Sequence, residues 1–142
     1  MNRAVPRLEE GWRLVTVPQN DDQRGSLCFA EWQHLPFEPQ RVFWIFGVPE
    51  GAQRGGHSHA TCAEVVFPVS GSFDMTVDTG SQRRTIRMDR PDTGIYIGPN
   101  TWCELTGFAP GTVCVVFASQ PYDPQGYVND YEVFLQNKRI KQ

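Results

Sequence analysis

Short runs of apolar residues, separated by turn-forming residues, recur along most of the chain. Thirteen glycines and eleven prolines are spread among them. Successive runs lie about ten residues apart, a spacing typical of an all-β sandwich or barrel. No stretch before residue 120 shows the period of a helix. The predicted strands are Trp12–Val17, Ser26–Trp32, Arg41–Val48, Ala63–Val69, Ser72–Val77, Arg84–Met88, Gly94–Ile97, Cys103–Gly107 and Thr112–Ser119.

The clearest alternation runs from residue 65 to residue 78. Odd positions hold mainly apolar side chains, and most even positions hold Pro, Ser, Asp or Thr. Period two predicts one face on a core and the other in water. Gly71 lies in the middle, where a missing side chain permits a sharp bend between two strands. Residues Asp78–Ser81 predict a hairpin turn into the next strand.

Three segments differ from this pattern. Arg41–Val48 is apolar on both faces, which predicts a strand inside the fold or at an interface, and Thr112–Ala118 is similar. Val128–Lys141 predicts one short helix, with Tyr131, Phe134 and Leu135 packing back on the body. Its last turn is basic, which suits the C-terminus of a helix.

Length and composition exclude several classes of protein. A chain of 142 residues predicts a single domain, with its core at about 24–120 and a C-terminal segment at 121–142. A net charge of −3 argues against a nucleic-acid surface. No apolar run approaches the ~20 residues of a membrane span, and no signal peptide is evident, so we expect a cytoplasmic protein with no membrane partner.

The four cysteines are predicted to be reduced and buried. Cys28, Cys62, Cys103 and Cys114 form no C-x-x-C pair, so neither a zinc knuckle nor a thioredoxin-like motif is indicated. Most of them stand beside apolar residues, where a free cysteine behaves as a small hydrophobic side chain.

Candidate chemistry centres on two of the three histidines. His57 and His59 are separated by one residue, and residues i and i+2 of an extended strand point the same way. Two imidazoles would therefore converge on one side of a strand. Imidazole titrates near neutrality and supports metal ligation, proton transfer or anion binding.

The residues around this pair strengthen the functional interpretation. Gly51, His57, His59, Glu64 and Gly71 give the pattern G-x5-H-x-H-x4-E-x6-G. It resembles the first motif of the cupin superfamily and implies a cupin double-stranded β-helix, or jelly roll, with a short C-terminal helix.

The second cupin motif usually supplies a further histidine as a metal ligand. The matching region, residues 94–104, contains none, and His34 lies far upstream. We therefore expect no metal and no other cofactor. One alternative stays open, in which His57, His59 and Glu64 hold iron as a two-histidine, one-carboxylate triad in a cupin oxygenase.

Longer strings narrow the resemblance. In this order they are similar to the sugar 3,4-ketoisomerase cupins of the WxcM-like or FdtA/QdtA type, over about residues 24–135. The strings are Arg24-Gly-Ser-Leu27, Pro36-Phe37, Arg41-Val-Phe-Trp-Ile-Phe46, Arg54-Gly-Gly-His-Ser-His59, Ser70-Gly-Ser-Phe73, Gly94-Ile-Tyr-Ile-Gly-Pro99 with Trp102, Val115-Val-Phe-Ala-Ser119 and Pro121-Tyr122-Asp123.

The resemblance implies an isomerase, in deoxysugar and polysaccharide biosynthesis, that acts on a dTDP-4-keto-6-deoxyhexose. Such enzymes move the carbonyl from C4 to C3, form homodimers and need no metal. The family pattern makes His57 and His59 the proton-transfer groups, one abstracting and the other shuttling or polarising, without saying which. A neutral imidazole is a suitable base at pH 7.

The substrate-binding residues are predicted from charge and aromaticity. Arg54, Arg24 and Arg41 are candidates for the diphosphate, because guanidinium binds phosphate oxygens through a planar fork. Arg54 is favoured, since it precedes His57 by three residues. Tyr96 and Trp102 are candidates for the nucleotide or sugar. Glu64 completes the predicted set.

Three positions depart from the family pattern. Members often carry Tyr-Tyr where this chain has Phe43-Trp44, Glu-Gln where it has Ala63-Glu64, and His or Arg where it has Cys103. These departures leave open a related epimerase and a non-catalytic cupin that binds a nucleotide sugar. The nucleotide base and the product configuration at C4 are not predicted.

Overall fold

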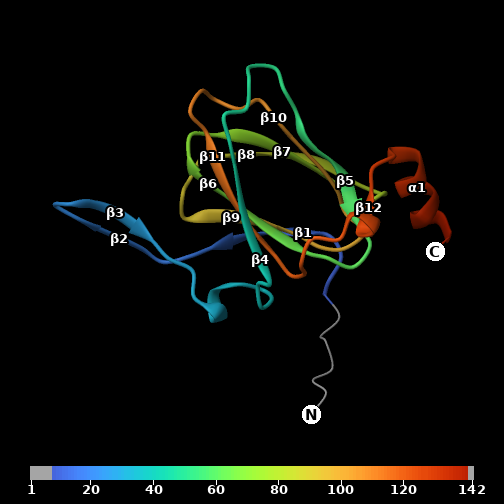
Figure 1. The fold of residues 1–142 in the computed structure, drawn as a ribbon, viewed down its shortest axis with the longest axis horizontal. Helices are drawn as coiled ribbons and strands as arrows, with labels where there is room; N and C mark the ends of the chain where they lie inside the picture. The colour runs from blue at the N-terminus through green and yellow to red at the C-terminus, as the bar shows by residue number, and fades with distance from the viewer. Residues whose placement is uncertain (1–7, 141–142) are drawn as a thin grey trace, which may run out of the picture.

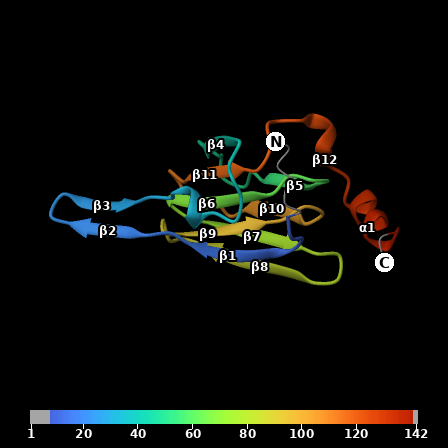
Figure 2. The same cartoon turned by 90° about the horizontal axis from the view of Figure 1, so that it is seen from below.

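Two five-stranded antiparallel sheets pack face to face in the computed structural model, which describes residues 8–140 (Figures 1 and 2). The first sheet has the order β1 (Trp12–Thr16), β9 (Thr93–Ile97), β6 (Glu64–Ser70), β11 (Val113–Ala118) and β4 (Arg41–Phe46). The second has the order β12 (Tyr127–Val128), β5 (Arg54–His59), β10 (Trp102–Thr106), β7 (Phe73–Asp78) and β8 (Arg83–Met88). The predicted all-β class is confirmed.

A separate hairpin projects from one end of the sandwich, away from α1 (Figure 1). It consists of β2 (Gln19–Asp22) and β3 (Gly25–Cys28), and nearly all of its residues are exposed. The predicted strand Ser26–Trp32 is wrong beyond residue 28. The chain instead forms a 3-10 turn, η1 (Trp32–His34), in which the Glu31 backbone N–H donates to Nδ1 of His34 at 2.7 Å.

The first sheet has an apolar cluster on each of its faces. Between the sheets lie Val66, Ile95, Ile97, Cys114 and Val116 of the first sheet, packed against Phe73, Met75, Val77, Met88, Cys103 and Leu105 of the second. On the outer face, a second cluster includes Val15, Val17, Phe37, Ala63, Val65, Phe67 and Tyr96, with Leu35 beside it. The segment around η1 therefore covers the first sheet from outside.

This double covering corrects the prediction for residues 65–78. β7 alternates as expected, with Phe73, Met75 and Val77 fully buried. In β6, however, both faces are buried up to Pro68, because the strand lies in the middle of the first sheet. Gly71, at φ +76°, forms the predicted bend between the two strands, and a Cβ there would meet the Thr112 hydroxyl.

β4 forms one edge of the first sheet, so of the two predicted alternatives the interior strand is wrong for one of its faces, and the interface stays a prediction. Val42, Trp44 and Phe46 are 49%, 60% and 67% exposed. Phe43 and Ile45 point the other way and pack against the core between the sheets. β11, in contrast, lies between β6 and β4, as its apolar faces predict.

The C-terminal segment crosses the open edge of the second sheet. It contains the 3-10 turn η2 (Pro124–Gly126), then β12, then α1 (Tyr131–Ile140). The predicted helix is confirmed from Tyr131 onward, because the Asp130 carboxylate accepts the Glu132 and Val133 backbone N–H groups at its start. Phe134 is buried and packs against Trp102. Lys141 lies outside the described residues.

All four cysteines are free, and Cys62, Cys103 and Cys114 are buried as predicted, whereas Cys28 is half-buried.

Within residues 8–140, no helix combines the length and apolar character that a membrane crossing requires.

Candidate active site

A bulge in β5 directs the histidine side chains. His57 pairs with Cys103 of β10 while Gly55 pairs with Glu104, so Gly56 is an extra residue on the β5 side. Gly55 and Gly56 have φ of +76° and +80°, a conformation that side-chain-bearing residues rarely adopt. A Cβ on Gly55 would also lie 3.0 Å from the Cys103 carbonyl oxygen. The two glycines therefore allow β5 to bulge just before its first histidine.

Beyond the bulge, His57 and His59 face the same side of β5, as their spacing predicts. Their ring centroids are 4.9 Å apart, and the rings are nearly perpendicular, at 81°. His59 is 5% exposed, whereas His57 is only partly buried and lines a cavity. The His57 imidazole is therefore accessible to a ligand in the cavity, whereas the His59 imidazole is buried behind it.

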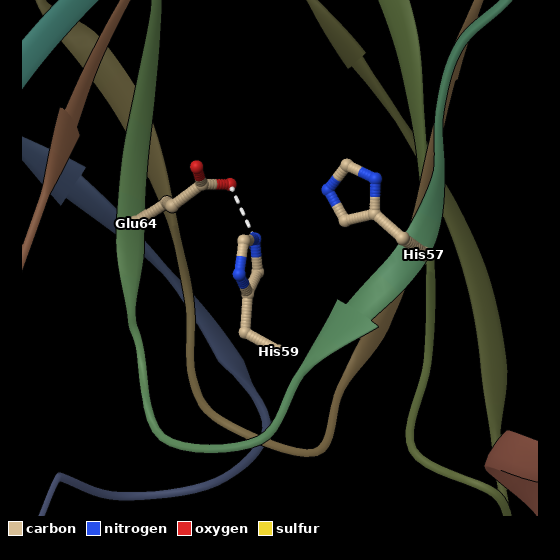
Figure 3. Close-up of side chains that lie close together, drawn as sticks. All are labelled: His57, His59 and Glu64. Atoms are coloured by element: carbon tan, nitrogen blue, oxygen red, sulfur yellow. Dashed lines mark ion pairs between the residues drawn. The ribbon is translucent and has the colours of Figure 1, made fainter. Parts of the chain in front are cut away.

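Glu64 meets this pair from the other sheet. Figure 3 shows its carboxylate, on β6, directed toward His59, with Oε1 3.5 Å from Nε2. Its other oxygen lies 3.9 Å from Nη2 of Arg41. Nε2 of His59 and Nε of Arg41 are buried without a hydrogen-bond partner among residues 8–140. The cluster therefore combines the Glu64 carboxylate with two buried nitrogen atoms that are still available for hydrogen bonds.

The cavity beside these groups has a volume of about 340 Å³, within the ~300–1,000 Å³ usual for small-molecule sites. It opens between the two sheets. Its apolar wall includes Ile45, Val66, Ile97, Leu105 and Val116. Its polar groups are Arg54, His57, Glu64, Tyr122, Tyr127 and Asn129. An apolar chamber with a few convergent polar groups is typical of a ligand site.

The surroundings of His57 keep its imidazole neutral. Burial lowers its pKa from 6.5 to about 4, and the neighbouring His59 and Arg54 act in the same direction, while Glu64 opposes them. At pH 7 the ring is therefore uncharged, the form that accepts a proton. Arg54 itself is exposed at the rim of the cavity and forms no ion pair with any described residue.

The structure brings together five of the eight predicted site residues. His57, His59 and Glu64 form the cluster, Arg54 lines the cavity, and Arg41 contacts Glu64.

Three other predicted site residues lie elsewhere. Tyr96 points to the outer face of the first sheet, where its hydroxyl donates to the Glu9 carbonyl at 2.7 Å. Trp102 packs on α1 and donates to Glu104. Strand alternation explains both corrections, since their neighbours Ile97 and Cys103 face the cavity instead. Arg24 stands 90% exposed at the hairpin turn, paired with Asp22.

Sequence reasoning missed the cavity residues from the C-terminal segment. Tyr122, Tyr127 and Asn129 line the cavity although they follow the last long strand. Tyr127 pairs with His59 in the β12–β5 ladder, and its ring centroid lies 4.4 Å from that of His59 and 5.0 Å from that of His57. The string Pro121-Tyr122-Asp123 contributed to the family resemblance, but no local signal placed Tyr127 beside the histidines.

The predicted alternative of a metal site can be tested on its donor atoms. One ligand atom each from His57, His59 and Glu64 lie within 4.8 Å of one another, so these residues could hold a metal ion. Two imidazoles and a carboxylate are suitable ligands for iron. Arg41, however, already places a positive charge next to the same carboxylate. The fit to a divalent cation is therefore incomplete.

Comparison with known proteins decides the family. The family model FdtA, described as WxcM-like, C-terminal, matches residues 10–139. The chain belongs to this family. A TDP-4-oxo-6-deoxy-alpha-D-glucose-3,4-oxoisomerase from Aneurinibacillus thermoaerophilus is 35% identical over 123 residues, which cover 86% of this chain and 88% of that protein.

Solved structures agree with the assignment to the FdtA family. QdtA, a sugar 3,4-ketoisomerase from Thermoanaerobacterium thermosaccharolyticum in complex with TDP, is 29% identical with a TM-score of 0.88, over 92% of this chain and 96% of that one. The WlaRB TDP-quinovose 3,4-ketoisomerase from Campylobacter jejuni is 35% identical with a TM-score of 0.85, over 91% and 100%. The predicted cupin fold, ketoisomerase family and isomerase class are confirmed.

The pKa of His57 gives a direct test of the site. We expect its imidazole to remain neutral from pH 7 to about pH 5, because burial moves its titration to about 4. Side-chain nitrogen NMR, assigned by loss of the signal in His57→Asn, would measure this. Because the unfolded chain binds the proton near pH 6.5, the free energy of unfolding should fall as the pH drops from about 6.5 toward 4. A midpoint near 6.5 in the folded protein would contradict the geometry.

Proposed function

We propose that this protein is a 3,4-ketoisomerase of a TDP-4-keto-6-deoxyhexose, in deoxysugar biosynthesis. The observation that carries the proposal is the convergence of His57, His59 and Glu64 on one side of a cavity of about 340 Å³. Relatives that are 29–35% identical carry this activity or a TDP ligand in their names.

The chemistry needs a group that carries a proton between adjacent carbons. Loss of the proton on C3, next to the C4 carbonyl, gives an enediol, and protonation at C4 then leaves the carbonyl at C3. A neutral imidazole can take up the first proton and return it. We assign this transfer to the histidine pair. Glu64, 3.5 Å from His59, stabilises positive charge on the pair while the proton is held.

The diphosphate is assigned to Arg54. Its guanidinium lies at the rim of the cavity, on the strand that carries both histidines. It is exposed and forms no ion pair with residues 8–140, so its N–H donors are available to phosphate oxygens. A nucleotide held there would place the attached sugar toward His57.

We also propose a homodimer in the cytoplasm. The exposed face of β4 carries Val42, Trp44 and Phe46 on an edge strand, a combination typical of an interaction surface. The hairpin that carries Arg24 projects from the end opposite α1 (Figure 1), whereas Tyr127 of β12, just before α1, lines the cavity. Arg24 could therefore reach a bound substrate only in the cavity of a second copy. Four free thiols suit a reducing compartment.

Substitution of either histidine tests the proposed proton transfer. His57→Asn and His59→Asn should each lower turnover of TDP-4-keto-6-deoxyglucose by ~100-fold or more, the usual scale for losing a general acid or base. Formation of the 3-keto product and uptake of solvent deuterium measure it, with EDTA present. Near-wild-type rates in both variants would refute the mechanism. A requirement for added iron would favour the metal alternative.

Substitution of Arg54 tests the assignment of the diphosphate. Arg54→Ala should raise the Kd for TDP roughly tenfold at low salt, which corresponds to one charge-assisted hydrogen bond. The difference from wild type should shrink at high salt, because exposed charges are screened. Arg90→Ala is the matched control, since Arg90 is also exposed but pairs with Asp92 on a turn that does not line the cavity. Equal affinities of wild type and Arg54→Ala at low salt would dismiss the assignment.

Substitution on the exposed face of β4 tests the proposed dimer. The purified protein should sediment as a dimer, and Trp44→Lys should sediment as a monomer because it places a charge in the proposed apolar interface. Val133→Lys is the control, since Val133 is an exposed apolar residue of α1. A monomeric wild type at micromolar concentration would exclude this dimer.

A further inference from the structure

The proposed reaction moves two hydrogens. One passes from C3 to C4 and is assigned above to the imidazoles. The other must leave the hydroxyl on C3, and a hydrogen must arrive on the C4 oxygen. The group responsible has to give a proton to one oxygen and take one from the other. This inference rests on the proposed function, because it concerns the same sugar.

Most polar groups of the cavity cannot fill this role. A guanidinium does not lose its proton in proteins, which excludes Arg54. The Asn129 amide does not ionise. Burial raises the pKa of the Cys103 thiol far above neutrality, so its thiolate is not formed. Glu64 is engaged with His59 and Arg41. Two phenols remain, on Tyr122 and Tyr127.

The two phenols differ in their surroundings. Tyr122 is 65% exposed, and its ring centroid is 5.9 Å from that of Tyr127. Tyr127 is half-buried and packs against both imidazoles, with its ring centroid 4.4 Å from that of His59 and 5.0 Å from that of His57. β12 fixes this position, because Tyr127 is the pairing partner of His59.

The Tyr127 hydroxyl is also oriented by a charge. Nη2 of Arg41 donates to it at 3.4 Å. Among the described residues the hydroxyl donates to no acceptor, so its own hydrogen can point to a ligand. Arg41 would also stabilise negative charge on the phenolate oxygen. Phe43, on the facing strand, lines the same cavity without a hydroxyl.

We propose that Tyr127 is the catalytic acid and base for the two sugar oxygens. As an imidazole takes the proton from C3, the C3–C4 double bond forms, the carbonyl electrons move to the C4 oxygen, and the Tyr127 O–H protonates that oxygen. The phenolate then takes the proton of the C3 hydroxyl. The C3 carbonyl forms as C4 receives from the imidazolium the proton that was taken from C3. Enzyme groups end as they began, and no oxidant or reductant is needed.

Tyr127→Phe tests the assignment, since it removes the oxygen and keeps the ring that packs on the histidines. We expect its kcat with TDP-4-keto-6-deoxyglucose to fall ~100-fold, the usual scale for this type of group. The Kd for TDP and the melting temperature should stay close to wild type. Tyr131→Phe is the matched control and should keep its kcat within about threefold, because the Tyr131 hydroxyl donates to Asp78 and does not line the cavity.

Other results would overturn the assignment. A Tyr127→Phe protein that keeps a third of the wild-type kcat would show that the oxygen is not needed. An equal loss of kcat in both variants would show that the loss is not specific to the cavity phenol, and a loss of TDP affinity at unchanged kcat would assign the phenol to binding. A wild-type protein that binds TDP but neither makes product nor exchanges deuterium would remove the proposed function, and this role of Tyr127 with it.

Discussion

The contact between Glu64 and His59 joins the two sheets at the point where the sandwich opens. Both side chains are buried, and a carboxylate at such depth is costly unless charged or polar groups face it. The imidazole at 3.5 Å and the guanidinium of Arg41 at 3.9 Å provide them. Because Glu64 belongs to β6 and His59 to β5, the cluster requires the present separation of the sheets. The apolar core between them therefore sets the geometry of the site.

Much of the fold could be predicted from the sequence. Alternation and turn residues located most long strands, because each buries at least one apolar face. Three strands lacked that signal, one of them the two-residue β12. β2 is Gln-Asn-Asp-Asp and buries nothing, and β5 begins Arg-Gly-Gly, with two residues that disfavour regular strands. Only the spacing of its histidines indicated that β5 is extended. The double burial of β6 depends on the outer segment around η1, which no local pattern describes.

The sequence predicted those residues of the candidate site that lie close together along the chain. His57, His59, Glu64 and Arg54 belong to one continuous motif, so their proximity follows from a single turn between two strands. Tyr96 and Trp102 lie in the second cupin motif, which also borders the cavity. The composition of that motif does not show which face of each strand points into the cavity. Tyr127 comes to His59 only through the pairing of β12 with β5, a contact between distant parts of the chain. Such contacts are set by the complete fold.

The pairing of β12 with β5 also decides whether the chamber is closed on one side. Residues 54–64 already carry both histidines and their carboxylate, whereas Tyr122 and Tyr127 reach the cavity only through the segment that follows β11. A chain in which β12 does not dock on β5 would therefore keep its chemical groups but leave the cavity open on that side.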